Sequence, residues 1–552
     1  MAVGVIRALA GLALAIGAGA AGGARADGAT PIAIENARPG DAGWKLAQPA
    51  AAGQLEAYLD EPSVAPGETV HVHARADGAH TIGWALYRMG WYGGAEGRRV
   101  ASGGPIAVGS QPTPAAAPDT GLVACAWPVT FTVSTDPGWT SGVHLLVLTR
   151  DDGPQSYAIF VLRGDGHRGA AVVQASFTTY QAYNRWGGRS AYGGFAPEIS
   201  YDRPFAEGNG AGQYFRFEHD LVRWAESRGY DLVYATDLDL DRDAGLLDGQ
   251  RLFLSVGHDE YWTRAAREHL EAALALGVNA AFLGSNAVYW QIRLEPSRSD
   301  PTRLRRTQVC YKSLSAQDPL RGTPLVTVAF RDPQVSWPEN ALVGVMYAGW
   351  NDASVPAAAW VVRDAGSWLY EGTGLADGDA IPAIVGYEID RVADNGLTPP
   401  GLEVVARSPY LLADGTPGTQ EAAVHVRPSG AFVFATGSND FSWGLSRPGV
   451  ADARVQRMMD NVFRRAGLAP SQVAAPPPAT PPAPPAPPSP PPASPPPASP
   501  PPAGGTVAAA APRSGGCASG GDGALGGLAA LAIAEAVVRA RRRRVSATAG
   551  SA

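Results

Sequence analysis

Between residues 170 and 283 the sequence alternates short strand-like runs with helix-like runs, and no other feature constrains the fold as strongly. The apolar strand-like runs occupy residues 170–175, 231–235, 252–256 and 278–283. The helix-like runs occupy residues 217–227 and 263–276. Successive β–α–β units place their strands in parallel and cover both faces of the sheet with helices. We therefore predict a doubly wound α/β domain over residues 164–470, with its ligand site outside the carboxyl ends of the strands.

Residues 32–163 follow a different pattern, in which short alternating or β-branched runs are separated by turn-forming pairs such as Pro-Gly and Asp-Gly. Such runs stand at Val70–Ala74, Val129–Val133 and Val143–Leu148. Several short strands with regular turn signals are typical of an Ig-like β-sandwich. The predicted fold class is thus α/β plus all-β, with an N-terminal sandwich followed by the α/β domain.

The beginning of the chain predicts export. Residues 1–26 contain Arg7, an apolar run over Ala8–Ala21, and the small residues Ala24 and Ala26 directly before Asp27. This order is typical of a secretory signal peptide with its cleavage site.

Residues 471–512 predict a spacer between the folded part and the C-terminal tail. The stretch from Pro476 to Pro502 consists almost only of Pro, Ala, Ser and Thr. Such a composition forms an extended polyproline stalk without a core of its own.

Residues 513–552 combine Cys517, an apolar segment over residues 524–538, and the basic cluster Arg541–Arg544. This order resembles the MYXO-CTERM class of sorting tails, which implies contact with a membrane or envelope. The basic cluster agrees with the positive-inside rule. The apolar segment is shorter than the roughly 20 residues of a stable span, so a frayed basic tail is the alternative. We expect the protein at the cell surface or outer envelope, or released outside the cell.

The charge and the cysteine content argue against binding of nucleic acid and of structural zinc. The chain carries a formal net charge of −7, and part of its arginine lies in the two terminal segments, so the central part is more acidic still. Binding to nucleic-acid phosphates needs clustered Lys and Arg, and we expect no nucleic-acid partner. Three cysteines without a CxxC pair do not form a zinc-like pattern. Because export permits disulfides, Cys125 and Cys310 can pair, although the sequence leaves this open.

The hexapeptide Gly257–Trp262 follows an apolar strand and precedes a helix. It places His258, Asp259 and Glu260 at a strand end, where burying such groups costs free energy and serves no packing purpose. The acidic pair can alternatively favour the helix dipole in the first turn. No Ser or Cys stands at this elbow and the sequence contains no Gly-x-Ser-x-Gly, which argues against acyl transfer by a nucleophilic triad.

Two further motifs follow predicted strands of the same domain. In Gly284-Ser285-Asn286 the amide of Asn286 can stabilise a developing oxyanion or simply cap a turn. The segment from Phe177 to Gly188, with Tyr192 shortly after it, is rich in aromatic residues. We predict a loop that lines a pocket, and a surface or interdomain packing loop is the alternative.

These motifs resemble those of the N,N-dimethylformamidase large (beta) subunit family over most of residues 55–466. The resemblance rests on Tyr87–Gly94, Tyr183-Asn184, Arg203-Pro204, Gly257–Trp262, Gly372–Gly374, Gly386–Arg391 and Ser442–Leu445. It implies a β-sandwich followed by a glutamine-amidotransferase-like α/β domain. It also implies a mononuclear Fe(III) held by two tyrosines and one glutamate.

Carried over position by position, the resemblance implies Glu260 as the carboxylate ligand and Tyr183 as one tyrosine ligand. The second tyrosine stays open between Tyr180 and Tyr192. His258, Asn286 and Glu388 are implied as catalytic groups around the ion.

Hard phenolate and carboxylate oxygens suit Fe(III), which can acidify a bound water or polarise an amide carbonyl. We therefore predict an exported, metal-dependent hydrolase that cleaves an amide or related C–N bond of a small-molecule substrate. The alternative is a non-catalytic surface protein that binds a glycan or envelope polymer. The substrate and the oligomeric state do not follow from the sequence.

Overall fold

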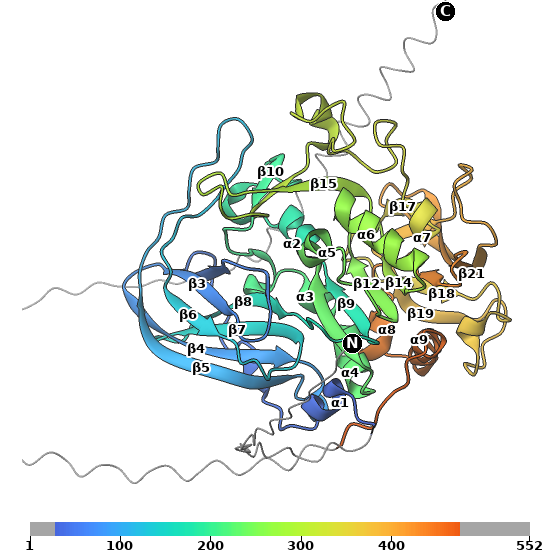
Figure 1. Cartoon of the computed structure of the whole chain (residues 1–552), viewed down its shortest axis with the longest axis horizontal. Coiled ribbons are helices and arrows are strands. Elements are labelled where there is room, and N and C mark those ends of the chain that lie inside the picture. The colour runs from blue at the N-terminus through green and yellow to red at the C-terminus, as the bar shows by residue number, and fades with distance from the viewer. Residues whose placement is uncertain (1–27, 475–552) are drawn as a thin grey trace, which may run out of the picture.

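The computed structural model describes residues 28–474 (Figure 1). The predicted signal peptide (1–26), the sorting tail (513–552) and all but the first four residues of the predicted stalk lie outside the described residues. Within residues 28–474, no helix has the length and apolar character that crossing a membrane requires.

The first part of the chain forms two β-sheets. One has the strand order β2-β8-β7-β4-β5 and the other the order β1-β3-β6. In the first sheet only β2 runs parallel to its neighbour, and the second sheet is antiparallel throughout. The strands are β1 (Leu55–Leu59), β2 (Ser63–Val64), β3 (Thr69–Ala76), β4 (His80–Met89), β5 (Gly97–Val108), β6 (Phe131–Ser134), β7 (Gly142–Arg150) and β8 (Gln155–Leu162).

Alternation along β3 explains how these two sheets share a core. Every second residue of this strand is buried, because successive side chains point to opposite faces. Val70 and Val72 thereby join the same apolar cluster as Leu146 and Phe160 of the other sheet.

The second part is built on a seven-stranded sheet of order β11-β9-β12-β14-β23-β22-β21. The first five strands are parallel, and β22 and β21 continue the sheet antiparallel. The strands are β9 (Ala171–Ala175), β11 (Leu232–Thr236), β12 (Leu252–His258), β14 (Asn279–Ser285), β21 (Glu403–Leu411), β22 (Pro417–Val426) and β23 (Phe432–Ala435).

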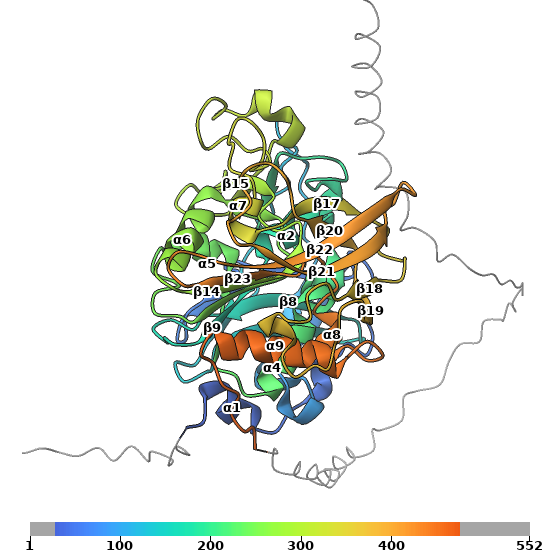
Figure 2. The ribbon, with the colours of Figure 1, turned by 90° about the vertical axis from the view of Figure 1, so that its right-hand side faces the viewer.

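Helices cover both faces of this sheet (Figure 2). On one face lie α4 (His219–Ser227) and α9 (Ala453–Arg465), and on the other α5 (Asp237–Arg242) and α6 (Arg264–Ala275). Adjacent residues of β9 serve the two layers, since Val173 joins the cluster of α4 and α9 while Val172 joins that of α5 and α6. The mixed α/β, strand-rich class is therefore confirmed.

Smaller sheets and short helices surround this frame. A four-stranded sheet has the order β10-β16-β15-β13, and two pairs are formed by β17 with β20 and by β18 with β19. These strands are β10 (Glu198–Ser200), β13 (Tyr261–Thr263), β15 (Trp290–Glu295), β16 (Thr307–Val309), β17 (Met346–Trp350), β18 (Ala358–Val361), β19 (Ala380–Val385) and β20 (Glu388–Arg391). The other helices are α1 (Pro31–Asn36), α2 (Phe177–Tyr183), α3 (Tyr214–Phe217), α7 (Asn340–Val343) and α8 (Trp443–Ser446).

A buried ion pair joins the two parts. Arg88 of β4 donates to both carboxylate oxygens of Glu226 in α4, at 2.8 and 2.9 Å, and both side chains are fully buried. Asn36 and Tyr234 also donate to Glu226, at 2.7 and 2.6 Å. The carboxylate is thus fully hydrogen-bonded, as a buried charge requires.

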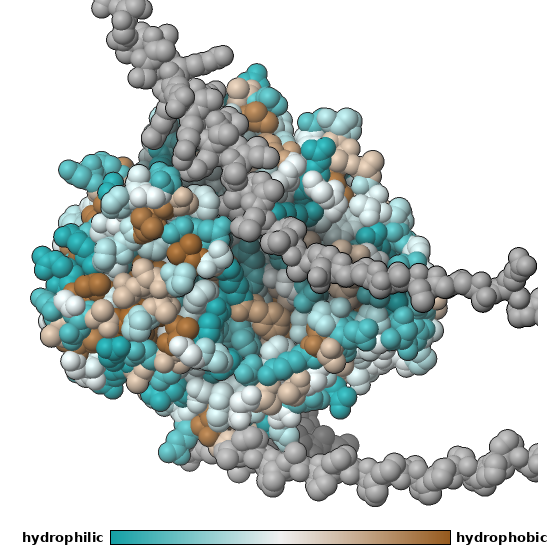
Figure 3. Space-filling model, turned by 180° about the vertical axis from the view of Figure 1, so that it is seen from behind, coloured by the Kyte–Doolittle hydropathy of each residue, from teal (hydrophilic) through white to brown (hydrophobic). Residues whose placement is uncertain are grey.

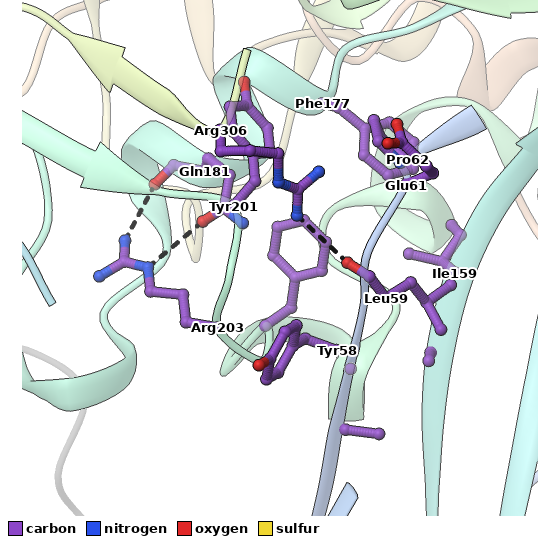
Figure 4. A pocket seen from close by; sticks show the side chains of 14 residues that line it. Tyr58, Leu59, Glu61, Pro62, Ile159, Phe177, Gln181, Tyr201, Arg203 and Arg306 are labelled. Atoms are coloured by element: carbon purple, nitrogen blue, oxygen red, sulfur yellow. Dashed lines mark hydrogen bonds between the residues drawn. The ribbon is translucent and has the colours of Figure 1, made fainter. Parts of the chain in front are cut away.

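A small cavity of about 30 Å³ also lies where the two parts meet (Figure 4). Tyr58 and Leu59 line it from β1, and Phe177 and Gln181 line it from α2. The volume is enough for about one water molecule.

On the outer surface seen in Figure 3, apolar side chains are interspersed with polar ones rather than gathered in one area. That pattern is ordinary for a folded protein surface.

Candidate active site

Strand β12 carries the Gly257–Trp262 segment to the carboxyl edge of the parallel sheet. Gly257 has φ +65°, and a Cβ atom there would lie 2.4 Å from the Cβ of Phe217, so only glycine fits without displacement. The chain leaves β12 after His258 and enters the short strand β13 at Tyr261. Helix α6 begins only at Arg264, so the segment spans two strands instead of leading directly into a helix.

The side chain of Glu260 meets two tyrosines. Tyr183 donates to Oε2 at 2.9 Å, and Tyr192 donates to Oε1 at 2.9 Å and to Oε2 at 3.1 Å. The two phenol oxygens lie 3.1 Å apart. Trp290 of β15 adds its indole N–H to Oε1 at 2.9 Å. Three oxygen-bearing side chains therefore converge on one point.

Burial, followed by the negative charge of Glu260, raises the pKa values of Tyr183 and Tyr192 well above their usual range. As the structure stands, both phenols keep their protons and act as donors to Glu260. Deprotonating either one requires a positive charge at this point.

Tyr183 is the last residue of helix α2, in a segment that we predicted as a loop. The loop prediction was wrong for Phe177–Tyr183, because contacts distant in sequence stabilise this helix. The N-cap residue Ser176 makes no side-chain cap bond. Instead, the backbone N–H of Thr178 donates to Asp237 at 2.8 Å, and Thr179 Oγ1 accepts the backbone N–H of Glu260 at 2.9 Å. Tertiary contacts of this kind override weak helix propensity.

Arg203 fixes the turn that leads from Tyr183 to Tyr192. Its guanidinium is buried, forms no ion pair among the described residues, and donates to the carbonyl oxygens of Asn184, Trp186 and Arg189, at 3.0, 3.2 and 2.9 Å. Figure 4 shows this side chain beside Gln181.

Tyr180 lies away from Glu260. It is buried one turn before Tyr183, and its hydroxyl donates to Glu218. The structure therefore brings Tyr183, Tyr192 and Glu260 together and leaves Tyr180 outside this group.

His258 lies between two acids. Its Nε2 is 3.3 Å from Glu260 Oε2 and 3.1 Å from Glu388 Oε2, and its Nδ1 is 3.1 Å from the hydroxyl of Tyr387. Burial opposes charge on the imidazole, but Glu388 and Glu260 outweigh it and raise the pKa of His258 to about 10. Asn439 donates to Glu388 at 3.2 Å and thereby orients it.

The other two residues of these motifs face elsewhere. Asp259 accepts hydrogen bonds from Gln174 and Ser255, at 2.8 and 2.7 Å, and so braces the strands. Asn286 adopts φ +56° and donates its backbone N–H to Asp390, while its side-chain oxygen is buried without a hydrogen-bond partner among the described residues.

Lys312 is a site neighbour that sequence reasoning missed. Its ammonium lies 3.6 Å from the ring centre of Tyr192, 4.8 Å from that of Trp290 and 5.1 Å from that of Tyr261. Burial lowers its pKa to about 8. One signal was available, since the chain contains only two lysines, Lys45 and Lys312, among its 44 basic residues.

Cys125 and Cys310 are both buried, and neither forms a disulfide within residues 28–474. The disulfide left open by the sequence does not form, because the two side chains belong to separate apolar clusters.

Residues 83–456 match the family described as N,N-dimethylformamidase beta subunit-like, C-terminal. The chain belongs to this family. The match contains the segments that carry Tyr183, Glu260 and Glu388.

Among individual proteins, the N,N-dimethylformamidase beta subunit of Alcaligenes sp is 33% identical over 79 residues. That alignment covers 14% of this chain and 10% of the Alcaligenes protein. A cycloisomaltooligosaccharide glucanotransferase of Paenibacillus sp., solved in complex with cycloisomaltoheptaose, matches 44% of this chain and 29% of its own. At 10% identity and a TM-score of 0.16, this second likeness bears on neither fold nor function.

Proposed function

We propose that this chain is a metal-dependent hydrolase of an amide or a related C–N bond, in which Tyr183, Tyr192 and Glu260 hold Fe(III). The observation that carries the proposal is the convergence of three oxygen-bearing side chains within 2.9 to 3.1 Å of one another. Membership of the dimethylformamidase-like family supports the reaction class.

The donor set fits such an ion. Ligand oxygens that share one ion at about 2.0–2.2 Å lie about 3 Å apart, and these three side chains already have that spacing. Phenolate and carboxylate oxygens are hard ligands that suit Fe(III). When bound, the ion would supply Lewis-acid polarisation of the amide carbonyl and acidify a water molecule.

Residues around the proposed ion, His258 and Glu388 among them, would transfer protons. His258 Nε2 reaches both Glu260 and Glu388, so it is placed to move a proton between the ligand sphere and Glu388. Tyr387 and Asn439 keep these two groups oriented. The side-chain oxygen of Asn286 is buried without a hydrogen-bond partner among residues 28–474, and its amide would bind the substrate amide.

We further infer that the two-sheet part is an Ig-like sandwich and that the second part is amidotransferase-like. The shared core of the two sheets and the helices on both faces of the parallel sheet support these assignments.

From the sequences of the two termini we also propose export to the cell surface or outer envelope. Fractionation of cells that make the full chain tests this, and recovery in the cytoplasm alone contradicts it.

Metal analysis of the purified protein tests the main proposal. We expect about one iron per chain, a visible absorption band, and hydrolysis of at least one member of a panel of formamides and acetamides. Glu260→Ala removes all three, whereas Glu268→Ala, at an exposed position of α6, keeps them. The proposal is contradicted if the purified protein contains no iron and its visible spectrum is the same as that of Glu260→Ala. Retained glycan binding without any turnover favours the surface-binding alternative.

A further inference from the structure

Arg216 contacts Tyr387, whose hydroxyl lies beside His258 of the candidate site. Its guanidinium carbon is 4.9 Å from the ring centre of Tyr387, 5.2 Å from that of Phe217 and 5.9 Å from that of Trp443. Within residues 28–474, the side chain of Arg216 makes no ion pair, and its Nε and Nη2 atoms are buried without a hydrogen-bond partner.

These two unpaired nitrogens form one edge of the planar guanidinium. That edge matches the two oxygens of a carboxylate, which it binds through parallel N–H···O bonds. Buried donors without acceptors are costly, and a native structure that keeps them requires an explanation. A bound anion supplies the missing acceptors.

The neighbouring Arg447 shows what a structural arginine in the same surroundings looks like. It also stacks on Trp443, with its guanidinium carbon 3.9 Å from the ring centre. Its nitrogens, however, are occupied by Asp220, at 2.8 and 2.9 Å. Stacking on Trp443 therefore does not by itself prevent an arginine from being paired.

Tyr387 connects Arg216 to the reaction centre. Its ring contacts the guanidinium, and its hydroxyl lies 3.1 Å from Nδ1 of His258. His258 in turn lies 3.3 Å from Glu260. A small substrate whose amide lies at Glu260 and whose charged end group extends past Tyr387 would bring that group to Arg216.

We propose that Arg216 binds the carboxylate of the substrate, so that the preferred substrates are carboxylate-bearing amides of the N-acyl amino acid class. This inference rests on the proposed hydrolase function for turnover but not for binding. Neutral alkyl amides lack the group that Arg216 recognises.

Asp440 is the acid that competes for Arg216 within the chain. The two side chains attract each other, yet within the described part of the chain no hydrogen bond joins them and Asp440 Oδ1 is buried without a hydrogen-bond partner. The experiment must therefore separate recognition of a ligand from a structural attraction between these two residues.

The probes are N-formylglycine and N-formylglycinamide, which differ only in carboxylate against carboxamide. Binding is measured by calorimetry on the full protein and on its Glu260→Ala form, and turnover is measured as kcat/KM for each probe. We expect N-formylglycine to be preferred by about 10- to 100-fold, the effect of one bidentate charged contact.

Arg216→Met removes the preference, and Arg216→Lys restores little of it because an ammonium lacks the two-pronged edge. Arg465→Met is the control, since Arg465 is exposed and stacks on Trp368 at 4.6 Å. It loses the same charge and an aromatic contact but keeps the preference. Thermal melting of each variant without probe shows whether it is folded.

Equal binding of the two probes by the unmodified protein overturns the inference. The inference is also overturned if Arg216→Met keeps the preference for N-formylglycine while Arg216→Met and Asp440→Asn lower the melting temperature equally. Carboxylate preference in binding without any hydrolysis supports the inference and contradicts the proposed function, so the two fail separately.

Discussion

Both carboxylate oxygens of Glu260 are held by neighbours from four different segments. Oε1 accepts from Tyr192 and Trp290, and Oε2 accepts from Tyr183 and lies 3.3 Å from His258. A ligand oriented in this way loses little freedom when it binds an ion. The orientation comes mainly from tertiary structure, because Tyr183, Tyr192 and Trp290 stand 77, 68 and 30 positions from Glu260 in the sequence.

A matched pair of substitutions tests whether Tyr192 or Tyr180 is the second of the two proposed tyrosine ligands. Tyr192→Phe removes a phenol oxygen next to Glu260, so we expect iron per chain to fall by at least about 10-fold together with the visible band. Tyr180→Phe keeps iron and the band. It destabilises the fold by about 1–3 kcal/mol, because the buried carboxyl of Glu218 loses its partner. Loss of iron in Tyr180→Phe and retention in Tyr192→Phe would reverse the assignment.

The buried residue His144 makes the free energy of unfolding depend on pH. His144 is fully buried between Trp139 and Phe160, at ring distances of 5.9 and 5.2 Å, and burial lowers its pKa to about 3. Its pKa in the unfolded chain is about 6.5. Between these values the unfolded chain binds a proton that the native protein does not, so this residue lowers stability as pH falls from 6.5 to 3.

His144→Phe removes that proton-linked loss. Urea unfolding at pH 7.5, 5.5 and 4.5 should show the free energy of unfolding of the wild type falling relative to the variant as the pH is lowered. A constant difference between the two proteins at all three values would contradict the low pKa of His144.

At the scale of elements, sequence periodicity located the first β–α–β units of the second part, but it gave no run for the long strands β4, β5, β21 and β22. The strands β9, β11, β12 and β14 and the helices α4 and α6 fall within about two residues of the predicted runs. Helix α2 and strand β13 escaped prediction, since their partners lie in other segments. The motifs indicated Glu260, Tyr183 and Tyr192 as candidates for the site. The site neighbours Lys312 and Asn439 were missed, because they come from segments without a recognisable pattern.

The turn at Gly257 gives an element-scale prediction. Gly257→Ala adds a methyl group 2.4 Å from Phe217 to a backbone with positive φ, whereas Gly277→Ala meets nothing within 4 Å at a similarly positive φ of +97°. Both variants carry the cost of the left-handed conformation. Overpacking should make Gly257→Ala less stable than Gly277→Ala by a further ~1–3 kcal/mol in chemical denaturation. Equal losses would mean that Phe217 moves freely aside.

At the scale of the whole molecule, the ion pair between Arg88 and Glu226 joins the two parts of the chain. The pair is completely buried and bidentate, and Asn36 and Tyr234 complete the shell of the carboxylate. Removing one partner leaves the other as an uncompensated buried charge. Such a loss affects both parts, because each contributes one side of the pair.

Arg88→Met should therefore lower the free energy of unfolding by about 3–5 kcal/mol, and Arg88→Met with Glu226→Met should recover part of it. The exposed pair Arg264–Glu268 is the matched control, and Glu268→Gln should change stability by less than about 0.5 kcal/mol. Denaturant titrations monitored by tryptophan fluorescence measure all three. A small effect of Arg88→Met would show that the two parts hold together without the pair.

This ion pair also sets an order of events during synthesis. Glu226 is translated 138 positions after Arg88, which takes about 7–28 s at ribosomal rates of roughly 5–20 residues per second. Throughout that interval Arg88 lacks its bidentate partner Glu226, and Glu35, which is translated earlier, is the acid whose charge it feels. The two sheets of the N-terminal part therefore reach their full stability only after helix α4 has been made.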